Sequence, residues 1–216
     1  MVFIYAVGYM HDDPRYPWFF TVFSLFTASM LGVVTSSSLL ELMIFWEIMG
    51  LCSFLLIGYY YERAEARRAA FKAFIITRIG DMGFLLAVAL LLGRYGTVDI
   101  PSLVNELARE PQSFLWLVCV LLFTAAVAKS AQFPAYIWLP DAMAGPTPVS
   151  GLLHSATMVA AGVFLVCRAY PVFEAAHFLP MIAGAGIFTA LFGACLALTA
   201  NDIKRLLPYS TMRPLG

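Results

Sequence analysis

Four ionisable residues lie inside strongly apolar stretches of the chain. Glu47 is in LLELMIFWEIMGLCSFLLIG, Asp81 in FKAFIITRIGDMGFLLAVALL, Lys129 in WLVCVLLFTAAVAKSAQFP, and His154 follows PTPVSGLLH. An ionisable side chain in mid-membrane costs roughly 2.5–3.5 kcal/mol on insertion scales, so such residues are usually functional. Carboxylates, an amine and an imidazole are groups that exchange protons. The four together predict a polar axis for protons or ions through a membrane bundle.

The two acidic positions each allow a structural interpretation as well. Glu47 is too short to reach the end of its stretch, and it is either a hydrogen-bonded structural carboxylate or a proton or ion site. Arg78 and Asp81 are three residues apart and share a helix face, so they can form a self-contained ion pair. Alternatively, Asp81 belongs to the polar path and Arg78 tunes it.

Lys129 lies in the segment VAKSAQFPAYIWLP, which also holds two prolines. The long lysine side chain can snorkel toward the helix end near Pro134. Pro134 is expected to interrupt the helix and free the Ser130 carbonyl, which must then be satisfied by protein or water. A lysine beside a broken helix suits a hydrated cavity in a transporter, so Lys129 is the predicted proton carrier.

His154 is the fourth member of the axis. Ser150 precedes it by four residues and Thr157 follows it by three, which predicts a polar stripe on one helix face. The histidine is either a hydrogen-bonded structural residue or a relay between a lysine and water.

The elements that must position these residues are membrane helices. Of the 216 residues, 62% are hydrophobic and 12% are charged, and the mean hydropathy is +0.84. A span needs about 20 apolar residues. The sequence therefore predicts an all-α integral membrane bundle with a discontinuous helix, forming one transmembrane domain over residues 1–216. Six spans are expected, at 17–36, 39–60, 70–93, 113–134, 148–170 and 180–200, with partial elements at both ends and a short interfacial helix beginning at Ser102.

The basic residues predict an orientation and the cysteines predict no site. Seven basic residues fall in connections on one side (Arg15, Arg63, Arg67, Arg68, Lys72, Lys204, Arg205) and three on the other (Arg94, Arg109, Arg168), so the first side is expected to be cytoplasmic. The four cysteines stand alone, and the chain has no P-loop or GxGxxG. We expect no metal or cofactor in this chain, and its zero net charge argues against nucleic acid as a partner.

Four segments carry a family resemblance. IFWEIMGLCSFLLIGYYYER, KAFIITRIGDMGFLL, VAKSAQFPAYIWLPDAMAGPTPVSGLLHSATMVAAGVFLVCR and LTANDIKRLLPYSTM resemble the subunit L (subunit 5) family of antiporter-like membrane subunits in proton-translocating NADH–quinone oxidoreductase, respiratory complex I. The photosynthetic NDH homologue is equally similar. The same core occurs in multi-subunit cation/proton antiporters.

The resemblance implies a proton path and a set of partners. It would use Glu47, Lys129, His154, Asp81 and Lys204, with Arg78, Pro134, Ser150 and Thr157 in support. NADH, flavin, iron–sulfur clusters and quinone would be bound by other membrane and peripheral subunits of a complex I-like assembly. The implied location is a bacterial plasma membrane, or an inner or thylakoid-type membrane.

The chain also departs from the family pattern. Where the family continues LAYSTxSQLG, this chain has LPYSTMRPLG, and Pro208 and Pro214 are expected to disturb the helix. The second repeat, with its own proton-exchanging residue, is absent, so we expect a truncated chain. Two alternatives to a redox-coupled proton pump stay open: a subunit of a multi-subunit Na⁺/H⁺ antiporter, and a non-functional fragment.

Overall fold

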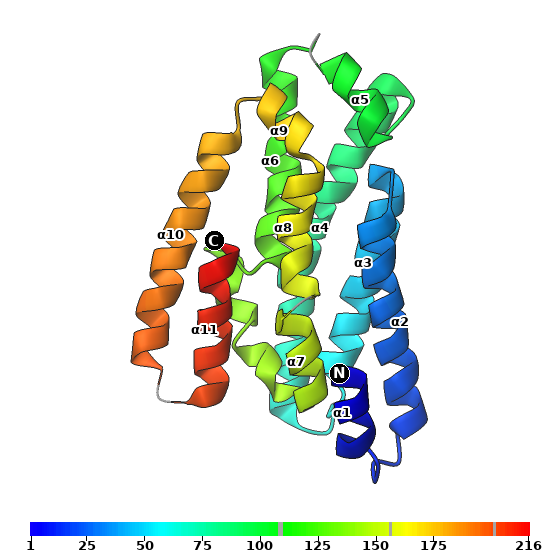
Figure 1. Cartoon of the computed structure of the whole chain (residues 1–216), viewed down its shortest axis with the longest axis vertical. Helices are drawn as coiled ribbons and strands as arrows, with labels where there is room; N and C mark the ends of the chain where they lie inside the picture. The colour runs from blue at the N-terminus through cyan, green and yellow to red at the C-terminus, as the bar shows by residue number, and fades with distance from the viewer. Residues whose placement is uncertain (108–109, 156, 201) are drawn as a thin grey trace.

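The computed structural model describes residues 1–107, 110–155, 157–200 and 202–216, apart from the side chains of residues 104, 105, 107, 155, 203 and 205. Arg109 and the side chain of Arg205, which entered the orientation count, lie outside this part. The described chain is a bundle of helices (Figure 1). The helices are α1 (Val2–Tyr9), α2 (Tyr16–Thr35), α3 (Leu39–Ile57), α4 (Ala64–Tyr95), α5 (Ile100–Leu107), α6 (Gln112–Lys129), η1 (Ala135–Trp138), η2 (Asp141–Ala144), α7 (Thr147–Ser155), α8 (Met158–Arg168), α9 (Tyr170–Ala175), α10 (Leu179–Thr199) and α11 (Ile203–Leu215).

Six stretches of the described chain are long and apolar enough to cross a membrane. They are α2, α3, α4, α6, the α7–α8 pair and α10. The predicted all-α membrane bundle with a discontinuous helix is therefore confirmed. The short α5 begins at Ile100, two residues before the predicted start at Ser102, because Leu103 N already bonds to Asp99 O at 3.0 Å.

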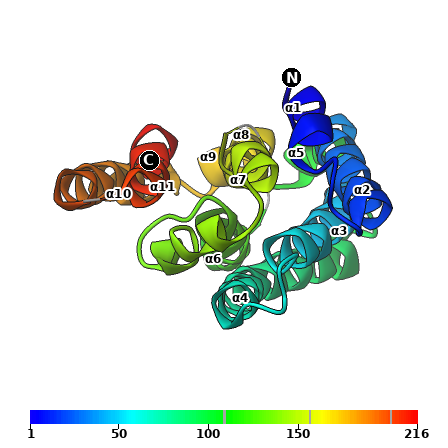
Figure 2. The same ribbon diagram turned by 90° about the horizontal axis from the view of Figure 1, so that it is seen from below.

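The core lies where α3, α4 and α6 meet, with α2 and α8 packed beside them (Figure 2). Gly80 of α4 lies against Ala128 of α6 so closely that a Cβ at Gly80 would come within 2.4 Å of the Ala128 side chain. Since only glycine allows this approach, the next residue on each helix, Asp81 and Lys129, is brought to the same level of the bundle.

Helix α6 ends in the middle of the bundle, at Lys129 (Figure 1). The chain turns at Ala131, whose φ is 51°, and Gln132 N bonds to Val127 O at 3.0 Å. The expectation that Pro134 interrupts this helix is wrong, since Pro134 lies beyond it. The interruption is made by the left-handed residue Ala131, and the indole of Trp138 returns to donate to Ala128 O at 2.9 Å.

The next span is interrupted as well. Helix α7 ends at Ser155 and Thr157 precedes α8, where its hydroxyl donates to Leu152 O at 2.6 Å. The predicted stripe of Ser150, His154 and Thr157 on one continuous helix face is therefore wrong. The two interruptions are connected, because the Ser130 hydroxyl donates to Val159 O at 2.8 Å.

Helices α10 and α11 form a hairpin at the edge of the bundle (Figures 1 and 2). Asp202 caps α11 by accepting a bond from Lys204 N at 3.0 Å. The helix continues through Pro208 and Pro214, contrary to the expectation that they would disturb it. The proline φ is compatible with a helix, and Pro208 lies early in α11, where it removes a single backbone hydrogen bond while packing against α10 is kept.

Candidate functional site

The structure brings four of the predicted residues together between α3, α4 and α6. We call Glu47, Arg78, Asp81 and Lys129 the charge cluster. They form two ion pairs, Asp81–Lys129 and Glu47–Arg78, with one member of each pair on α4. Three of the four residues of the predicted polar axis, Glu47, Asp81 and Lys129, are therefore in these two pairs.

The Asp81–Lys129 pair is sealed inside the bundle. Nζ of Lys129 lies 3.3 Å from Oδ2 of Asp81, and the two side chains are 0% and 3% exposed. Snorkelling of Lys129 is therefore excluded in this structure. Within the described chain, Nζ makes no hydrogen bond, so its contact with Asp81 is electrostatic and its N–H groups are not satisfied. Buried polar groups are usually hydrogen-bonded, so this position stands out among the described residues.

Two residues that the sequence did not single out hold this pair in place. The indole Nε1 of Trp46 donates to Oδ1 of Asp81 at 2.6 Å, and the Trp46 ring centroid lies 5.7 Å from Nζ of Lys129. Gly50, one helical turn later on α3, leaves room for the amine: a Cβ at Gly50 would lie 2.8 Å from Nζ and 3.7 Å from Oδ2 of Asp81. The only signal for both was their spacing from Glu47 on the same helix.

The Glu47–Arg78 pair is less enclosed. A carboxylate oxygen of Glu47 accepts a bond from Nη1 of Arg78, and the two side chains are 29% and 37% exposed. The Arg78 guanidinium also lies 5.0 Å from the Phe74 ring centroid. The interpretation of Arg78 and Asp81 as a self-contained pair is wrong, because each has a partner on another helix.

His154 is buried near this cluster but does not join it. The residue is 5% exposed, and its ring lies 6.4 Å from that of Trp138. Neither ring nitrogen finds a hydrogen-bond partner in the described part of the molecule. The interpretation of His154 as a hydrogen-bonded structural residue is therefore not supported, and both nitrogens are left for water or a proton.

Lys204 and Ser150 lie at the end of the bundle where α4, α7 and α11 begin (Figure 1). Lys204 lines three hollows of about 360, 180 and 400 Å³, and Ser150 lines the second of them. We refer to these three hollows together as the Lys204 hollow. The third also holds an ion pair that sequence reasoning missed, Lys72–Asp141 at 2.7 Å. The WLPDAM motif contained Asp141, but nothing in it indicated Lys72 as the partner.

Metal and thiol chemistry find no arranged site in the described residues. No group of three or more His, Cys, Asp or Glu side chains is placed to hold a metal ion there. Cys52 and Cys119 are buried, Cys167 and Cys195 are exposed, and all four are free thiols.

Comparison of the chain with known proteins gives a family match and similar proteins. The family described as NADH:quinone oxidoreductase/Mrp antiporter, TM, matches residues 36–216. The NAD(P)H-quinone oxidoreductase chain 5 of Synechocystis sp. is 49% identical over 223 aligned positions, which cover 100% of this chain and 33% of the relative. The chloroplastic subunit 5 of Helianthus annuus is also 49% identical, with 30% of its length covered. The chain thus spans about a third of the length of these relatives.

Solved structures agree with the fold. The Mrp complex from Dietzia sp. contains a chain that superposes with a TM-score of 0.81 at 38% identity, covering 90% of this chain and 22% of that one. A chain of the membrane-bound sulfane sulfur reductase, an archaeal respiratory membrane complex, gives a TM-score of 0.86 at 23% identity. The second similarity shows the fold alone.

Proposed function

Because the chain belongs to the NADH:quinone oxidoreductase/Mrp antiporter membrane family, we propose that it forms the proton-carrying part of a membrane-arm subunit in an NAD(P)H–quinone oxidoreductase. Electron transfer to quinone would take place in other subunits and drive the protons. The observation that carries the proposal is the Asp81–Lys129 pair, sealed between α4 and the interrupted end of α6.

The charge cluster supplies a physical basis for proton transfer. Lys129 has one carboxylate beside it and N–H groups without hydrogen-bond partners in the described chain. Two unit charges 4 Å apart interact by roughly 4 kcal/mol at an effective dielectric constant of 20. A change in the charge on Asp81, whose Oδ2 lies 3.3 Å from Nζ, would therefore act strongly on the amine of Lys129. In the proposed cycle, Lys129 carries the proton, and Asp81 and Glu47 set the field.

The remaining predicted residues supply a route to this point. The Lys204 hollow gives water a place to collect at one end of the bundle, with Ser150 on its wall. His154 is four residues after Ser150 on the same helix, α7, and its ring nitrogens have no partner in the described chain. We assign His154 as the relay between the hollow and Lys129, with ordered water completing the path. Thr157 supports the α7–α8 junction through its bond to Leu152 O. Pro134 has no proton role here and belongs to the segment that follows α6.

The assembly and location follow from the relatives. NAD(P)H, flavin, iron–sulfur clusters and quinone would be held by partner subunits. Relatives from Synechocystis and from chloroplasts favour a thylakoid or plasma membrane as the location. A gradient-driven Mrp-type antiporter is the second candidate, favoured by the Dietzia structure, but the 38% identity there is below the 49% found for subunit 5.

The test is made on the parent complex in sealed membrane vesicles. Lys129→Ala and Glu47→Ala should each lower the number of protons moved per NAD(P)H oxidised, while electron transfer from NAD(P)H to a water-soluble acceptor at the flavin continues. Arg94→Ala is the control, because Arg94 lies at the C-terminal end of α4, away from the charge cluster, and pairs there with Glu110. Unchanged proton-to-electron ratios in both variants reject the assignment. Proton movement that follows a sodium gradient without NAD(P)H favours the antiporter instead.

A further inference from the structure

We propose that a groove between the ends of α2, α3 and α4 is a binding site for one anionic phospholipid, with the lipid phosphate on Arg67 and an acyl chain along the apolar wall. The groove is separate from the charge cluster and from the Lys204 hollow, and its lining shares no residue with either.

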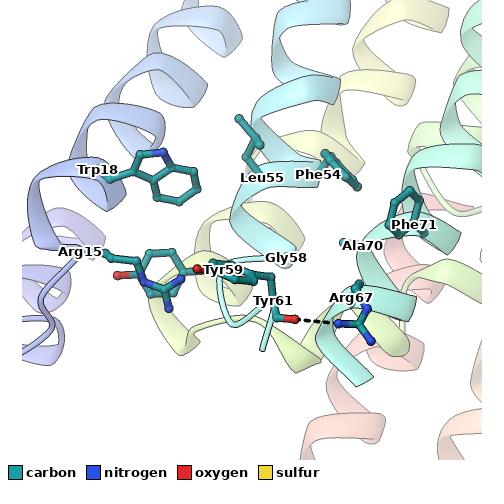
Figure 3. A pocket seen from close by; sticks show the side chains of 10 residues that line it. All are labelled: Arg15, Trp18, Phe54, Leu55, Gly58, Tyr59, Tyr61, Arg67, Ala70 and Phe71. Carbon is teal, nitrogen blue, oxygen red and sulfur yellow. Dashed lines mark hydrogen bonds between the residues drawn. The ribbon is translucent and has the colours of Figure 1, made fainter. Parts of the chain in front are cut away.

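The groove has the size and the wall of a ligand site. Its volume is about 480 Å³, within the range of about 300–1,000 Å³ that is typical of small-molecule sites. The apolar wall is formed by Trp18, Phe54, Leu55, Ala70 and Phe71 (Figure 3). These residues come from three spans, α2, α3 and α4, and they lie above Arg67 in this view (Figure 3).

The rim of the groove carries two arginines with different surroundings. Arg15 pairs with Glu62 at 3.2 Å, and its guanidinium carbon lies 4.6 Å from the centroid of the Tyr59 ring. Arg67 donates only to the carbonyl of Tyr61, at 3.4 Å, and has no carboxylate partner in the described part of the chain (Figure 3). Arg67 therefore keeps a full positive charge and most of its five N–H donors for another anion.

The position of these groups selects the class of ligand. Arg15 and Arg67 lie at the helix ends, beside Trp18, Tyr59 and Tyr61, and aromatic residues at span ends mark the level of lipid headgroups. A phospholipid has the matching order of an apolar chain and then a phosphate. A free phosphate would use only the rim, and an uncharged apolar molecule would use only the wall. The unpaired cation favours an anionic headgroup over a zwitterionic one.

The experiment measures lipid retained by the chain after extraction from its own membrane, with its bound partners, in mild detergent. Native mass spectrometry after titration with phosphatidylglycerol or phosphatidylcholine counts the bound molecules. We expect one tightly held phosphatidylglycerol, bound about fivefold more tightly than phosphatidylcholine, as for one basic residue at a charged membrane surface. Arg67→Gln should remove this preference.

Arg68→Gln is the matched control, because Arg68 is the next residue on α4, is exposed and does not line the groove. A second variant, Leu55→Trp, fills the apolar wall and should displace the acyl chain while Arg67 remains. Retention of the preference in Arg68→Gln and its loss in Arg67→Gln and Leu55→Trp support the site. An equal loss in Arg67→Gln and Arg68→Gln overturns it in favour of general surface charge. No preferred lipid on the unmodified chain, or inorganic phosphate competing fully with the lipid, also overturns it.

Discussion

The two ion pairs of the charge cluster lie three residues apart on α4 but differ in their surroundings. Asp81–Lys129 is closed to solvent and is served by a third group, the Trp46 indole. Glu47–Arg78 is about one-third exposed and, among the described residues, has a contact of Arg78 with the Phe74 ring besides its own bond. A buried pair gives up the hydration of two charges, and loss of one member leaves the other uncompensated. A partly exposed pair is less enclosed by protein, so loss of one member leaves the other less completely buried.

From this difference we expect the two ion pairs to have different roles in the charge cluster. The sealed pair fixes a charge at one place, so it is sensitive to any change in the field around it. We expect the Glu47–Arg78 pair to open more easily, and opening it would change that field. The variants below are ordered from the largest expected effect to the smallest, and each tests whether the two pairs really differ.

Replacement of Lys129 by methionine should give the largest effect. The substitution keeps the length of the side chain but leaves the Asp81 carboxylate buried without a cation, which costs roughly 3–5 kcal/mol of unfolding free energy. Chemical unfolding of the detergent-purified chain, followed by tryptophan fluorescence, measures it. A loss below 1 kcal/mol would show that Asp81 is not held as an anion by Lys129.

Trp46→Phe tests the third partner of the sealed pair. The variant keeps an aromatic ring but removes the donor that lies 2.6 Å from Oδ1 of Asp81. A hydrogen bond to a charged group contributes about 1.5–3 kcal/mol, so a loss of that size is expected in the same unfolding measurement. Trp18→Phe is the control, since Trp18 is 43% exposed and no hydrogen bond of its indole is found in the described chain. Equal effects of the two variants would contradict a specific role of Trp46.

Gly50→Ala tests the space that the amine of Lys129 occupies. The added Cβ would lie 2.8 Å from Nζ, so the amine must shift from its observed place beside Asp81. We expect a loss of about 1–3 kcal/mol, as for overpacking of a core. The proton-to-electron ratio of the parent complex should also fall. Gly93→Ala on α4 is the control, because a Cβ there meets nothing within 4 Å. A fall in the ratio for both variants would indicate a general effect of alanine.

The Glu47–Arg78 pair should show little thermodynamic coupling. A double-mutant cycle with Glu47→Gln and Arg78→Gln is expected to give about 0.6 kcal/mol, the average for hydrogen bonds between membrane helices, since both side chains are only partly enclosed. The same cycle for Asp81→Asn and Lys129→Met should give a larger value. If the first cycle equals or exceeds the second, the distinction between the two pairs is lost.

The smallest effect is expected at Asp13, in the connection before α2. Burial acts to raise the pKa of Asp13, but the Tyr59 hydroxyl at 2.6 Å, the Arg15 amide at 2.9 Å and the Arg15 charge outweigh it and hold the pKa below its ordinary value of 3.8. A lowered pKa means that this carboxylate stabilises the fold fully above pH 3.8, and that the stabilisation is lost as the pH falls through the lower value of the folded state.

The measurement is the unfolding midpoint between pH 5 and pH 2. The unmodified chain should lose stability over this window slightly more than Asp13→Asn, in which the group cannot titrate. Identical pH profiles would show that the contact of Asp13 with Tyr59 contributes nothing.

The sequence located the ionisable residues inside the spans but did not predict their partners. Glu47, Asp81, Lys129 and His154 could be identified because an ionisable residue inside an apolar span is visible in the hydropathy pattern of the sequence. The partners required the packing of three helices. Helical spacing placed Arg78 beside Asp81. In the structure, however, Arg78 pairs with Glu47 of α3 and Asp81 pairs with Lys129 of α6.

The helix interruptions show a second limit of sequence reasoning. Pro134 was the visible breaker, yet the turn is made by Ala131 at φ 51°, a position for which the residue type gives no signal. Conversely, Pro208 and Pro214 lie within α11, where capping by Asp202 and packing on α10 compensate for them. Local propensity was outweighed by tertiary packing in both directions.

The hydrogen bond from Ser130 to Val159 restrains how easily the end of α6 can shift within the bundle. It connects the end of α6 to α8, so Lys129 cannot shift far without breaking it or moving α8 as well. Hydrogen bonds between membrane helices contribute about 0.6 kcal/mol on average, which is only about a threefold change in population at room temperature. At that value the bond is a weak restraint by itself, so its loss would change the balance between the observed arrangement and a shifted one by only about threefold.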